Sequence, residues 1–356
     1  MQIMKLRIAV YAIALNEIKH VDRWLEATKH ADVRVVADTG STDGTPEKLK
    51  EAGVQVHHIT VKPWRFDVAR NAALALVPND VDVCLILDLD EVPEKDFFKK
   101  VRNQWVDGAH RGWIWLDTGQ PWKADRLHVR HNYHWVCPCH EVAMFYGDEE
   151  QKYCEIDAHI KHEPDSGKSR KHYLQILELA VKERPHDARM WNYLVREYYY
   201  NQMWEPLLTA ADKMLELPGW VVEQAAVCRW AGEACHWLNK VEEATAYFDR
   251  GVQILPTEGE PWYGVCVDAY RRHQWGRLLD AAIKIMELPR STHHVYESAV
   301  WDWKAYDFAA VAAYNLGHVS EALTFAKKAL NAPGAEGERV VNNIKFMEGV
   351  LNGSSS

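Results

Sequence analysis

Three features that would narrow the function at once are missing from this sequence. It has no run of 18 apolar residues, the length that a helix needs to cross a membrane. Acidic residues outnumber basic ones by 51 to 42, so the basic surplus typical of nucleic-acid-binding proteins is absent. A glycine-rich basic phosphate loop, typical of nucleotidyltransferases, is missing from the first apolar segment, YAIALNEIKH. The sequence thus favours a protein without membrane spans and without general affinity for nucleic acid.

Cysteine is scarce, and its spacing matches no common metal motif. Cys137 and Cys139 are separated by one residue, whereas the cysteines of a zinc knuckle are usually separated by two. A zinc site that also includes His134 and His140 remains an alternative. Four other cysteines lie in apolar strand or helix patterns, as expected for reduced, buried side chains of a cytoplasmic protein. These are Cys84, Cys228, Cys235 and Cys266.

The first half of the chain alternates between strand-like and helix-like patterns. Such alternation predicts a parallel sheet with helices on both faces, and ligands of these sheets bind where the strands end. Asn16 and Glu17, then Asp38, then Asp88 and Asp90 follow the ends of three predicted strands, so we expect them to share one edge. Strands are predicted at residues 7–15, 33–37, 54–59 and 83–87, and helices at 18–30, 67–76 and from Pro46, capped by Thr45, to residue 53.

Strand patterns end near residue 170, and helical patterns follow one another from there. Prolines recur at residues 185, 218, 256, 289 and 333, and intervals in the thirties are typical of helical-hairpin repeats. The segment LGHVSEALTFAKKALNAP (316–333) resembles the second helix of a tetratricopeptide unit. Most tryptophans of this half are expected in its core. Two further units are suggested by Trp191, Leu194 and Tyr198, and by Gly232, Ala244, Phe248 and Pro256.

Four short motifs of the first half occur in a characteristic order: ALNE, ADTGSTDGT, FDVARNAAL and LDLDE. Together they resemble a family 2 glycosyltransferase of the GT-A fold, and in particular bacterial members with a tetratricopeptide tail. The resemblance covers most of the chain. It implies an α/β GT-A domain at residues 1–168 with a Rossmann-like, mostly parallel sheet. An all-α tetratricopeptide-like solenoid is expected at residues 169–352, and a disordered tail at 353–356.

The resemblance assigns the acids of LDLDE to the donor substrate. Asp88, Leu89 and Asp90 match the family's Asp-x-Asp motif, which holds Mn²⁺ or Mg²⁺ and, through the metal, the diphosphate of a nucleotide sugar. Asp90 is expected to contact the metal directly, whereas Asp88 contacts the ribose, or the metal through water. His162 in IKHEP matches a late metal ligand of such enzymes, and His159 is the alternative.

Other donor contacts are implied by the same resemblance. Asp38 matches the aspartate that binds the nucleobase, commonly uracil, and Glu17 matches a residue near the ribose. Arg70 could pair with a diphosphate oxygen or with Asp88, because its planar fork suits oxyanions. A helical ion pair with Asp67 is the simpler alternative for Arg70. The remaining residues expected around the donor are Ala14, Asn16, Thr39 and Gly40.

Two basic residues and a histidine-rich segment complete the predicted site. Lys168 and Arg170 follow IKHEP in a loop that could close over the diphosphate, or could be a solvated linker. In RLHVRHNYHWVCPCHEVAMFYG (126–147), Glu141 is the first candidate for the base that deprotonates the acceptor, and His140 is the second. A polar loop or strand pair with buried histidines is the alternative. Tyr133 and Trp135 could instead stack on the apolar face of a sugar.

The combined reading is an inverting, metal-dependent glycosyltransferase that uses a nucleotide sugar, with UDP-sugars favoured by the resemblance. The helical repeats would hold a glycan or protein acceptor, or would form a homodimer. A modified DNA base remains open as an acceptor, although the formal charge of −9 makes it less favourable. A degenerate domain serving as a repeat scaffold and a nucleotidyltransferase are the two rival functions. The intact acids and Arg70 argue against the first rival, and the missing phosphate loop argues against the second.

Overall fold

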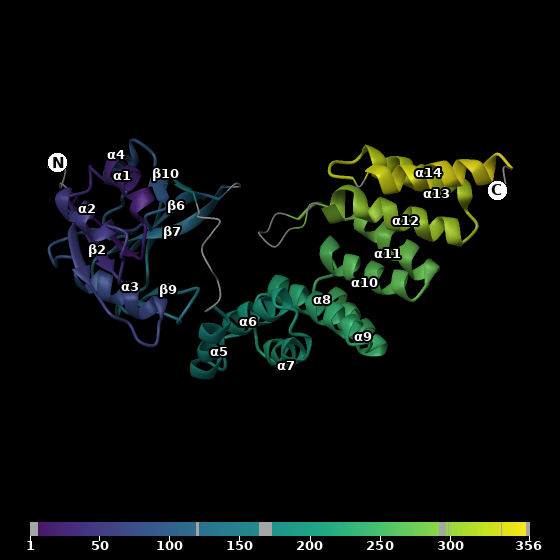
Figure 1. Cartoon of the computed structure of the whole chain (residues 1–356), viewed down its shortest axis with the longest axis horizontal. Helices are drawn as coiled ribbons and strands as arrows, with labels where there is room; N and C mark the ends of the chain where they lie inside the picture. Colours follow the sequence, from purple (N-terminus) through teal and green to yellow (C-terminus); the bar gives the residue numbers. More distant parts are fainter. Residues whose placement is uncertain are drawn as a thin grey trace. The chain divides into compact units, whose positions relative to one another are not determined.

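The computed structural model describes residues 6–118, 121–163, 173–291, 297, 299–335 and 337–353. The chain divides into two compact units, Met1–Ala180 and Val181–Ser356. The first unit contains the strands and the second contains helices (Figure 1). The boundary predicted between residues 168 and 169 lies outside the described residues.

An eight-stranded mixed sheet forms the centre of the first unit, in the order β3-β2-β1-β4-β7-β6-β10-β5. The four strands β3, β2, β1 and β4 are parallel, as predicted. Strand β7 runs antiparallel to both β4 and β6, which the alternation of strands and helices did not predict. The strands are β1 (Ile8–Ala14), β2 (Val33–Asp38), β3 (Gln55–His58), β4 (Val83–Ile86), β5 (Glu91–Pro93), β6 (Arg111–Asp117), β7 (Pro121–Val129) and β10 (Tyr153–His162).

The reversed strand β7 restores the direction of the strands beyond it. Because β7 is antiparallel to its two neighbours, β6 points the same way as β4, and β10 is parallel to β6. Six strands, namely β1, β2, β3, β4, β6 and β10, therefore end at the same edge of the sheet. The short strand β5 pairs antiparallel with the end of β10 and brings the acids that follow β4 to that edge.

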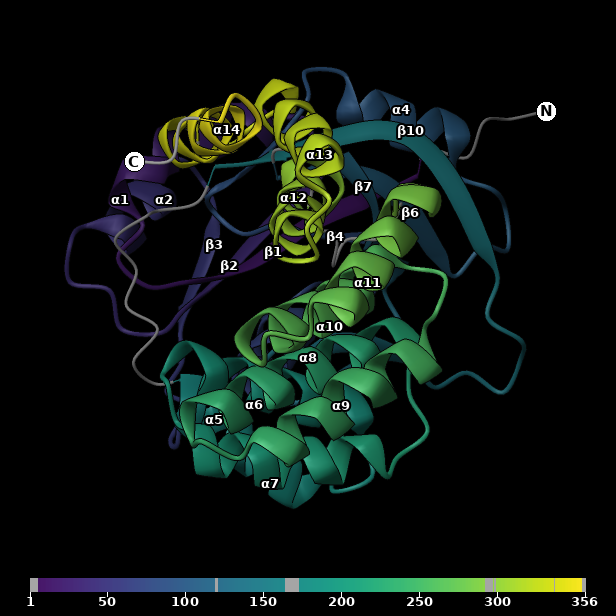
Figure 2. The ribbon, with the colours of Figure 1, turned by 90° about the vertical axis from the view of Figure 1, so that its right-hand side faces the viewer.

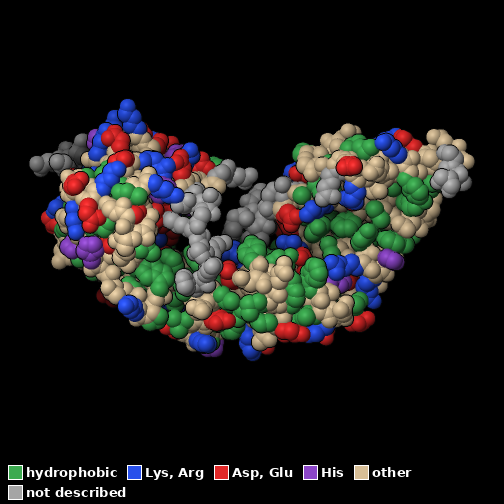
Figure 3. Space-filling model, viewed as in Figure 1, with side chains coloured by type: hydrophobic (Ala, Val, Ile, Leu, Met, Phe, Trp, Pro, Cys, Tyr) green, Lys and Arg blue, Asp and Glu red, His purple; other side chains and the backbone are tan. Residues whose placement is uncertain are grey.

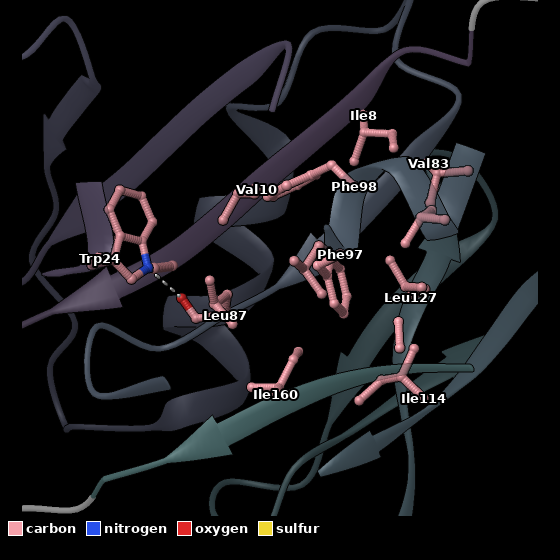
Figure 4. Packing of buried hydrophobic residues seen from close by; sticks show 14 of the residues in the cluster. Ile8, Val10, Trp24, Val83, Leu87, Phe97, Phe98, Ile114, Leu127 and Ile160 are labelled. Carbon is pink, nitrogen blue, oxygen red and sulfur yellow. Dashed lines mark hydrogen bonds between the residues drawn. The ribbon is translucent and has the colours of Figure 1, made fainter. Parts of the chain in front are cut away.

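Helices cover both faces of this sheet. Alternate residues of β1 point to opposite faces, and each set is buried in its own hydrophobic cluster with residues of the covering helices. Ile8 and Val10 pack on one face with Trp24 and Phe97, as Figure 4 shows. Tyr11 points to the opposite face. Each of these side chains is fully buried, which contributes about 1.5–3 kcal/mol for an aliphatic or phenyl side chain. The helices are α1 (Ile18–Ala27), α2 (Thr45–Glu51), α3 (Phe66–Ala75) and α4 (Phe97–Gln104), and a second sheet pairs β8 (Tyr133–Val136) with β9 (Val142–Phe145).

A buried chain of hydrogen bonds links β1, β7 and β8. The indole of Trp135 donates to the hydroxyl of Tyr11 at 2.9 Å, and this hydroxyl lies 2.8 Å from Nε2 of His128. Nδ1 of His128 lies 2.7 Å from the carbonyl oxygen of Val129. A neutral imidazole satisfies this arrangement, since Nδ1–H donates to the carbonyl and Nε2 accepts from Tyr11. Burial lowers the pKa of His128 to about 4.

This buried histidine makes stability depend on pH. Because its pKa is lower in the folded state than the ordinary value of 6.5, the unfolded chain binds more protons between these two values. We expect the free energy of unfolding of the first unit to fall by up to about 3 kcal/mol as the pH drops from 6.5 to 4. Urea unfolding at several pH values measures this slope, and His128→Gln should make it shallower. An unchanged slope in the variant would contradict the assignment.

Paired antiparallel helices form the second unit, as the repeat pattern predicts. Helix α6 packs on α7, α8 on α9, α10 on α11 and α12 on α13, and successive pairs also pack on one another (Figure 2). The recurring prolines lie in the loops that separate the pairs, where a missing backbone N–H breaks no helical hydrogen bond. The helices are α5 (Tyr173–Glu183), which spans the boundary, then α6 (Ala188–Tyr200), α7 (Trp204–Leu215), α8 (Val221–Trp237), α9 (Val241–Ile254), α10 (Gly259–Arg271), α11 (Trp275–Glu287), α12 (Ala305–Asn315), α13 (Val319–Asn331) and α14 (Gly337–Leu351).

Two glycines let three helices approach one phenylalanine. Phe248 of α9 is 1% exposed, and Gly232 of α8 and Gly264 of α10 both face its ring. A Cβ atom added at Gly232 would lie 2.6 Å from the ring, and one added at Gly264 would lie 2.5 Å from it. Close packing of the helices around the phenylalanine ring therefore explains why the repeat pattern has glycine and phenylalanine at these positions.

We expect Gly264→Ala to destabilise the helical unit by about 1–3 kcal/mol, because the ring has no space to move away. Gly276→Ala is the matched control, since Gly276 also lies in a helix but has nothing within 4 Å of an added Cβ. The control should be neutral or stabilising by up to about 1 kcal/mol. Urea unfolding followed by far-UV circular dichroism tests both variants. Equal stability of the two variants would contradict the packing argument.

The expectation that most tryptophans of the helical unit belong to its core is wrong. Trp303 is 7% exposed, but Trp220 and Trp237 are 42% and 62% exposed. Figure 3 shows hydrophobic side chains among charged ones on the surface of this unit. Alanine and aliphatic side chains fill much of the core instead, and most of the large indole rings lie at the helix surfaces. The intermediate cases are Trp191, Trp204, Trp230, Trp262, Trp275 and Trp301.

Candidate active site

Asp38 is the last residue of β2, and three neighbouring residues hold its carboxylate in place. Its carboxylate is 1% exposed and accepts from the backbone N–H groups of Gly40 at 3.1 Å and Ser41 at 3.2 Å. Nδ1 of His58 lies 3.0 Å from the same carboxylate. Sequence reasoning missed His58, although the parallel pairing of β2 with β3 places it opposite Asp38. Gly40 has a φ of +116°, which side chains rarely tolerate, so glycine is required in this turn.

The loop after β1 is fastened to the loop after β2. The backbone N–H of Asn16 donates to Oγ of Ser41 at 2.8 Å, and Oδ1 of Asn16 accepts from the N–H of Thr42 at 2.8 Å. The backbone N–H and the hydroxyl of Thr39 both donate to the carbonyl oxygen of Ala14. These contacts bring the predicted residues Ala14, Asn16 and Thr39 together and give them a shared role in holding the two loops.

Asp43 joins the starts of α1 and α2, and sequence reasoning missed it. Its carboxylate accepts from the backbone N–H of Ile18 at 3.0 Å and from that of Thr45 at 3.0 Å. Burial alone would raise the pKa of Asp43, but these bonds and one from the Thr45 hydroxyl lower it. The predicted cap by Thr45 is wrong, because α2 begins at Thr45 itself. Its hydroxyl instead accepts from the N–H of Glu17 at 2.9 Å, which holds the buried Glu17 at the end of β1.

Arg70 links the acids after β4 to the segment between β8 and β9. Its guanidinium donates two hydrogen bonds to Asp88, at 2.7 and 3.0 Å, and a third to Glu141 at 2.7 Å. The guanidinium carbon also lies 5.5 Å from the centre of the Trp135 ring. Burial would lower the pKa of Arg70, but the charges of Asp88 and Glu141 raise it well above its ordinary value. Arg70 is therefore a buried cation held by two carboxylates.

Two predicted contacts in this region are wrong. Asp67 pairs with Arg65 at 2.8 Å, so the helical ion pair between Asp67 and Arg70 is replaced by the longer-range contacts just described. Tyr133 and Trp135 are 8% and 7% exposed and belong to the hydrophobic cluster beneath α3. Their burial removes them as surfaces on which a sugar could stack.

Asp90 and His162 meet at the edge where β5 pairs with the end of β10. Oδ2 of Asp90 lies 3.6 Å from Nε2 of His162, and this contact raises the pKa of the imidazole. The neighbouring Glu91 is buried, accepts from the N–H of Asp88 at 3.0 Å and pairs with Arg126. Burial raises the pKa of Glu91. Leu89, between these acids, is 1% exposed and anchors the turn in the core.

The other predicted residues have different surroundings. His140 has a φ of +48°, and its ring centre lies 6.0 Å from that of Tyr173 in α5. His159 faces away from Asp90, where its ring stacks on Trp115 and lies near Asp157. Lys168 and Arg170 lie outside the described residues.

Comparisons with known proteins identify the first unit. The model of glycosyl transferase family 2 matches residues 10–174. These residues form a family 2 glycosyltransferase domain. The match spans the Asp38 turn, Arg70, the Asp88–Asp90 turn and the end of β10. The comparison with curated proteins gives no match.

MamA, YrrB and TTC0263 are among the solved structures that are similar to this chain. MamA is 15% identical to this chain, and the matched region covers 47% of this chain and 94% of MamA, with a TM-score of 0.38. YrrB, described as a TPR protein with an unusual peptide-binding site, is 14% identical and covers 49% and 83%, with a TM-score of 0.39. TTC0263, a TPR protein of Thermus thermophilus, is 15% identical and covers 51% and 90%, with a TM-score of 0.35. The tetratricopeptide-like architecture of the second unit follows from its own helix pairs. No described helix is long and apolar enough to span a membrane.

The charges of the glycosyltransferase domain fit a divalent cation. Asp88 and Glu141 pair with Arg70, Glu91 pairs with Arg126, and Asp90 lies 3.6 Å from His162, so four carboxylates lie near two guanidiniums and one imidazole. Within the described residues, no three His, Cys, Asp or Glu side chains are placed to hold a metal. Mg²⁺ commonly uses one or two carboxylates of the protein and completes its shell with phosphate and water.

The alternative zinc site is not formed. The described residues Cys137, Cys139, His134 and His140 are not placed as a metal-binding group. Nε2 of His134 instead lies 3.2 Å from the side-chain amide of Asn71. The second cysteine, Cys139, is fully buried.

Proposed function

We propose that this protein is an inverting glycosyltransferase that moves a sugar from a nucleotide diphosphate, UDP for preference, to an acceptor hydroxyl. The observation that supports the proposal best is the guanidinium of Arg70, which donates hydrogen bonds to Asp88 of the donor-side motif and to Glu141 at the same time. One buried cation therefore fixes a donor-side carboxylate and the candidate base together at the edge of the sheet. Asp38 lies at the end of β2 on the same edge.

The donor nucleotide is expected to lie over the ends of β1 and β2. Asp38 would hydrogen-bond the nucleobase, and the buried Glu17 would lie near the ribose. Asp38 already accepts bonds from Gly40, Ser41 and His58, which fix its orientation before the base arrives. Such preorganisation lowers the cost of binding. Lys168 and Arg170 remain candidates for contacts with the diphosphate.

Asp90 and His162 would hold Mn²⁺ or Mg²⁺ against the diphosphate. When bound, the cation neutralises the charge that develops on the leaving diphosphate. Asp88 is 31% exposed and both of its oxygens are bonded to Arg70, which supports a role toward the ribose or toward the metal through water.

Glu141 is the proposed general base. Its carboxylate would take the proton of the acceptor hydroxyl while the hydroxyl oxygen bonds to the anomeric carbon. The bond from that carbon to the diphosphate oxygen breaks on the opposite side, so the configuration inverts. Arg70 positions Glu141 through the 2.7 Å bond to Nε. His140 is the second candidate, and its strained backbone supports a fixed position beside Glu141.

The helical unit is proposed to hold the acceptor, either a glycan or a protein. The free cysteines support a cytoplasmic location. Burial raises the pKa of the Cys84 and Cys228 thiols to about 12, which keeps them inert. A modified DNA base is a less favourable acceptor because of the net negative charge.

Binding and product analysis test the proposal. A thermal-shift screen of UDP-, GDP-, TDP- and CMP-sugars, with and without Mn²⁺, should show metal-dependent stabilisation by one nucleotide class. Slow hydrolysis of that donor should release the nucleoside diphosphate. Release of pyrophosphate from a nucleoside triphosphate in the presence of a sugar 1-phosphate would instead indicate a nucleotidyltransferase. No stabilisation by any nucleotide sugar would favour the degenerate domain that acts as a repeat scaffold.

A further inference from the structure

One face of strands β6 and β10 carries aromatic side chains that are not part of the core. Ile114 of β6 and Ile160 of β10 point into the cluster beneath α4 (Figure 4). Because successive side chains of a strand point to opposite faces, Trp113, Trp115 and His159 lie on the other face. Among the described elements, α4 is the helix that packs extensively on β10, and it does so from the core side.

The rings on this outer face are aligned in two stacks. Trp113 and Tyr153 stack with their planes 25° apart, and Trp115 and His159 stack with their planes 15° apart. Lys123 of β7 lies over the Trp115 ring at 5.7 Å. Tyr153 is 50% exposed, and the side chain of His159 is 48% exposed. We call these five residues the aromatic face.

The aromatic face presents flat apolar surface between charged groups. Lys123 pairs with Glu155 at 2.7 Å, and Lys161 lies opposite Asp117 in the strand pairing. Partly exposed tryptophans held in fixed planes indicate a binding surface, since they offer a large contact area at a low entropic cost. The interleaved charges of both signs supply donors and acceptors for hydroxyl groups.

The aromatic face leads to the edge of the sheet that carries the candidate active site, although the side chains of His159 and His162 point to opposite faces of β10. Strand β10 runs from His159 to His162, three residues that span about 10 Å. His162 contacts Asp90 at the edge where the donor is proposed to bind. A chain molecule lying along β6 and β10 would therefore have one end at the sheet edge where the donor is proposed to bind.

We propose that the aromatic face is an acceptor-binding surface in addition to the helical unit, and that the acceptor is a chain of hexose units. This inference rests on the proposed function. A pyranose ring has an apolar C–H face and a rim of hydroxyl groups, which match the tryptophan planes and the flanking charges. An extended peptide would instead use backbone bonds along the part of β10 that precedes its pairing with β5 at Ile160, and it would not require the ring planes.

Isothermal titration of the full chain with maltohexaose, cellohexaose, laminarihexaose and mannohexaose, without any donor, tests the proposal. At least one of these should bind, and Trp113→Ala and Trp115→Ala should each weaken it by roughly tenfold or more. Trp115→Tyr keeps a ring and should retain most of the affinity. Circular dichroism and the unfolding midpoint show whether each variant is folded.

Trp122→Ala is the matched control. Trp122 is 50% exposed and belongs to the same strand pair, but it lies opposite Leu116 on the core side of the sheet. Its variant should bind the hexasaccharide as the wild type does, and so should Asp90→Asn, which affects only the donor site. Absence of binding to all four sugars, equal loss in Trp122→Ala, or wild-type binding by both alanine variants of the aromatic face would overturn the proposal. Donor-induced thermal stabilisation, measured on the same proteins, reports separately on the proposed function.

Discussion

Arg70→Lys is expected to reduce donor turnover by roughly 10²–10³-fold while the protein stays folded. Lysine keeps the positive charge, but it cannot make three directed bonds to two carboxylates as the planar guanidinium does. Glu141 would lose its fixed position relative to Asp88, and misplacement of a catalytic group costs this much. The measurement is the rate at which nucleoside diphosphate is released from the donor identified in the thermal-shift screen.

Arg70→Ala should act on stability as well. It leaves Asp88 and Glu141 without their shared cation, and removing one partner of a buried ion pair costs about 3–5 kcal/mol. Combining it with Asp88→Asn in a double-mutant cycle should recover part of this loss. Arg65→Lys is the matched control, because Arg65 makes a forked contact with Asp67 at the same helix. Equal turnover in Arg70→Lys and Arg65→Lys would show that Arg70 contributes only a structural ion pair and does not position Glu141.

Asp90→Asn should abolish the metal-dependent stabilisation by the donor and lower turnover by at least about 10³-fold. The amide has the same shape but lacks the charge that attracts a divalent cation. A loss of 10³-fold corresponds to about 4 kcal/mol, within the several kcal/mol that a metal contributes to charge stabilisation. Thermal shifts at saturating donor, with and without Mn²⁺, measure the binding effect directly.

Asp96→Asn is the control for this prediction. Asp96 is an exposed acid near the same turn, and its side chain lies 3.9 Å from Lys100, away from the site network. Its variant should respond to donor and Mn²⁺ as the wild type does. Normal metal-dependent stabilisation in Asp90→Asn would show that Asp90 is not a metal ligand, and would favour Asp88 as the ligand instead.

Much of the local structure could be predicted because it depends on short-range patterns. The predicted strand at residues 83–87 and helix at residues 67–76 correspond closely to β4 and α3. The change to paired helices near residue 170 is also confirmed, since a repeat of apolar positions requires repeated packing. The position of Asp38 and of the Asp88–Asp90 turn at one sheet edge follows from the parallel order of β1, β2 and β4.

Contacts between distant segments could not be predicted in the same way. His58 bonds Asp38 because β3 lies beside β2, and Glu141 bonds Arg70 across a separation of 71 residues. Side chains with both apolar and polar parts were also ambiguous. Trp135 and Trp115 are both tryptophans in strands, but Trp135 is buried and Trp115 is partly exposed.

The sequence by itself determined the two kinds of architecture and the residue types available for donor binding. Periodicity specifies which face of a strand or helix is apolar, and turn residues mark where each element ends. The tertiary structure decided which carboxylates Arg70 binds, that Asp43 joins the starts of α1 and α2, and which tryptophans face solvent. The physical reason is that a side chain's partners and burial depend on the strand or helix packed beside it, and strand order brings together residues that local patterns leave independent.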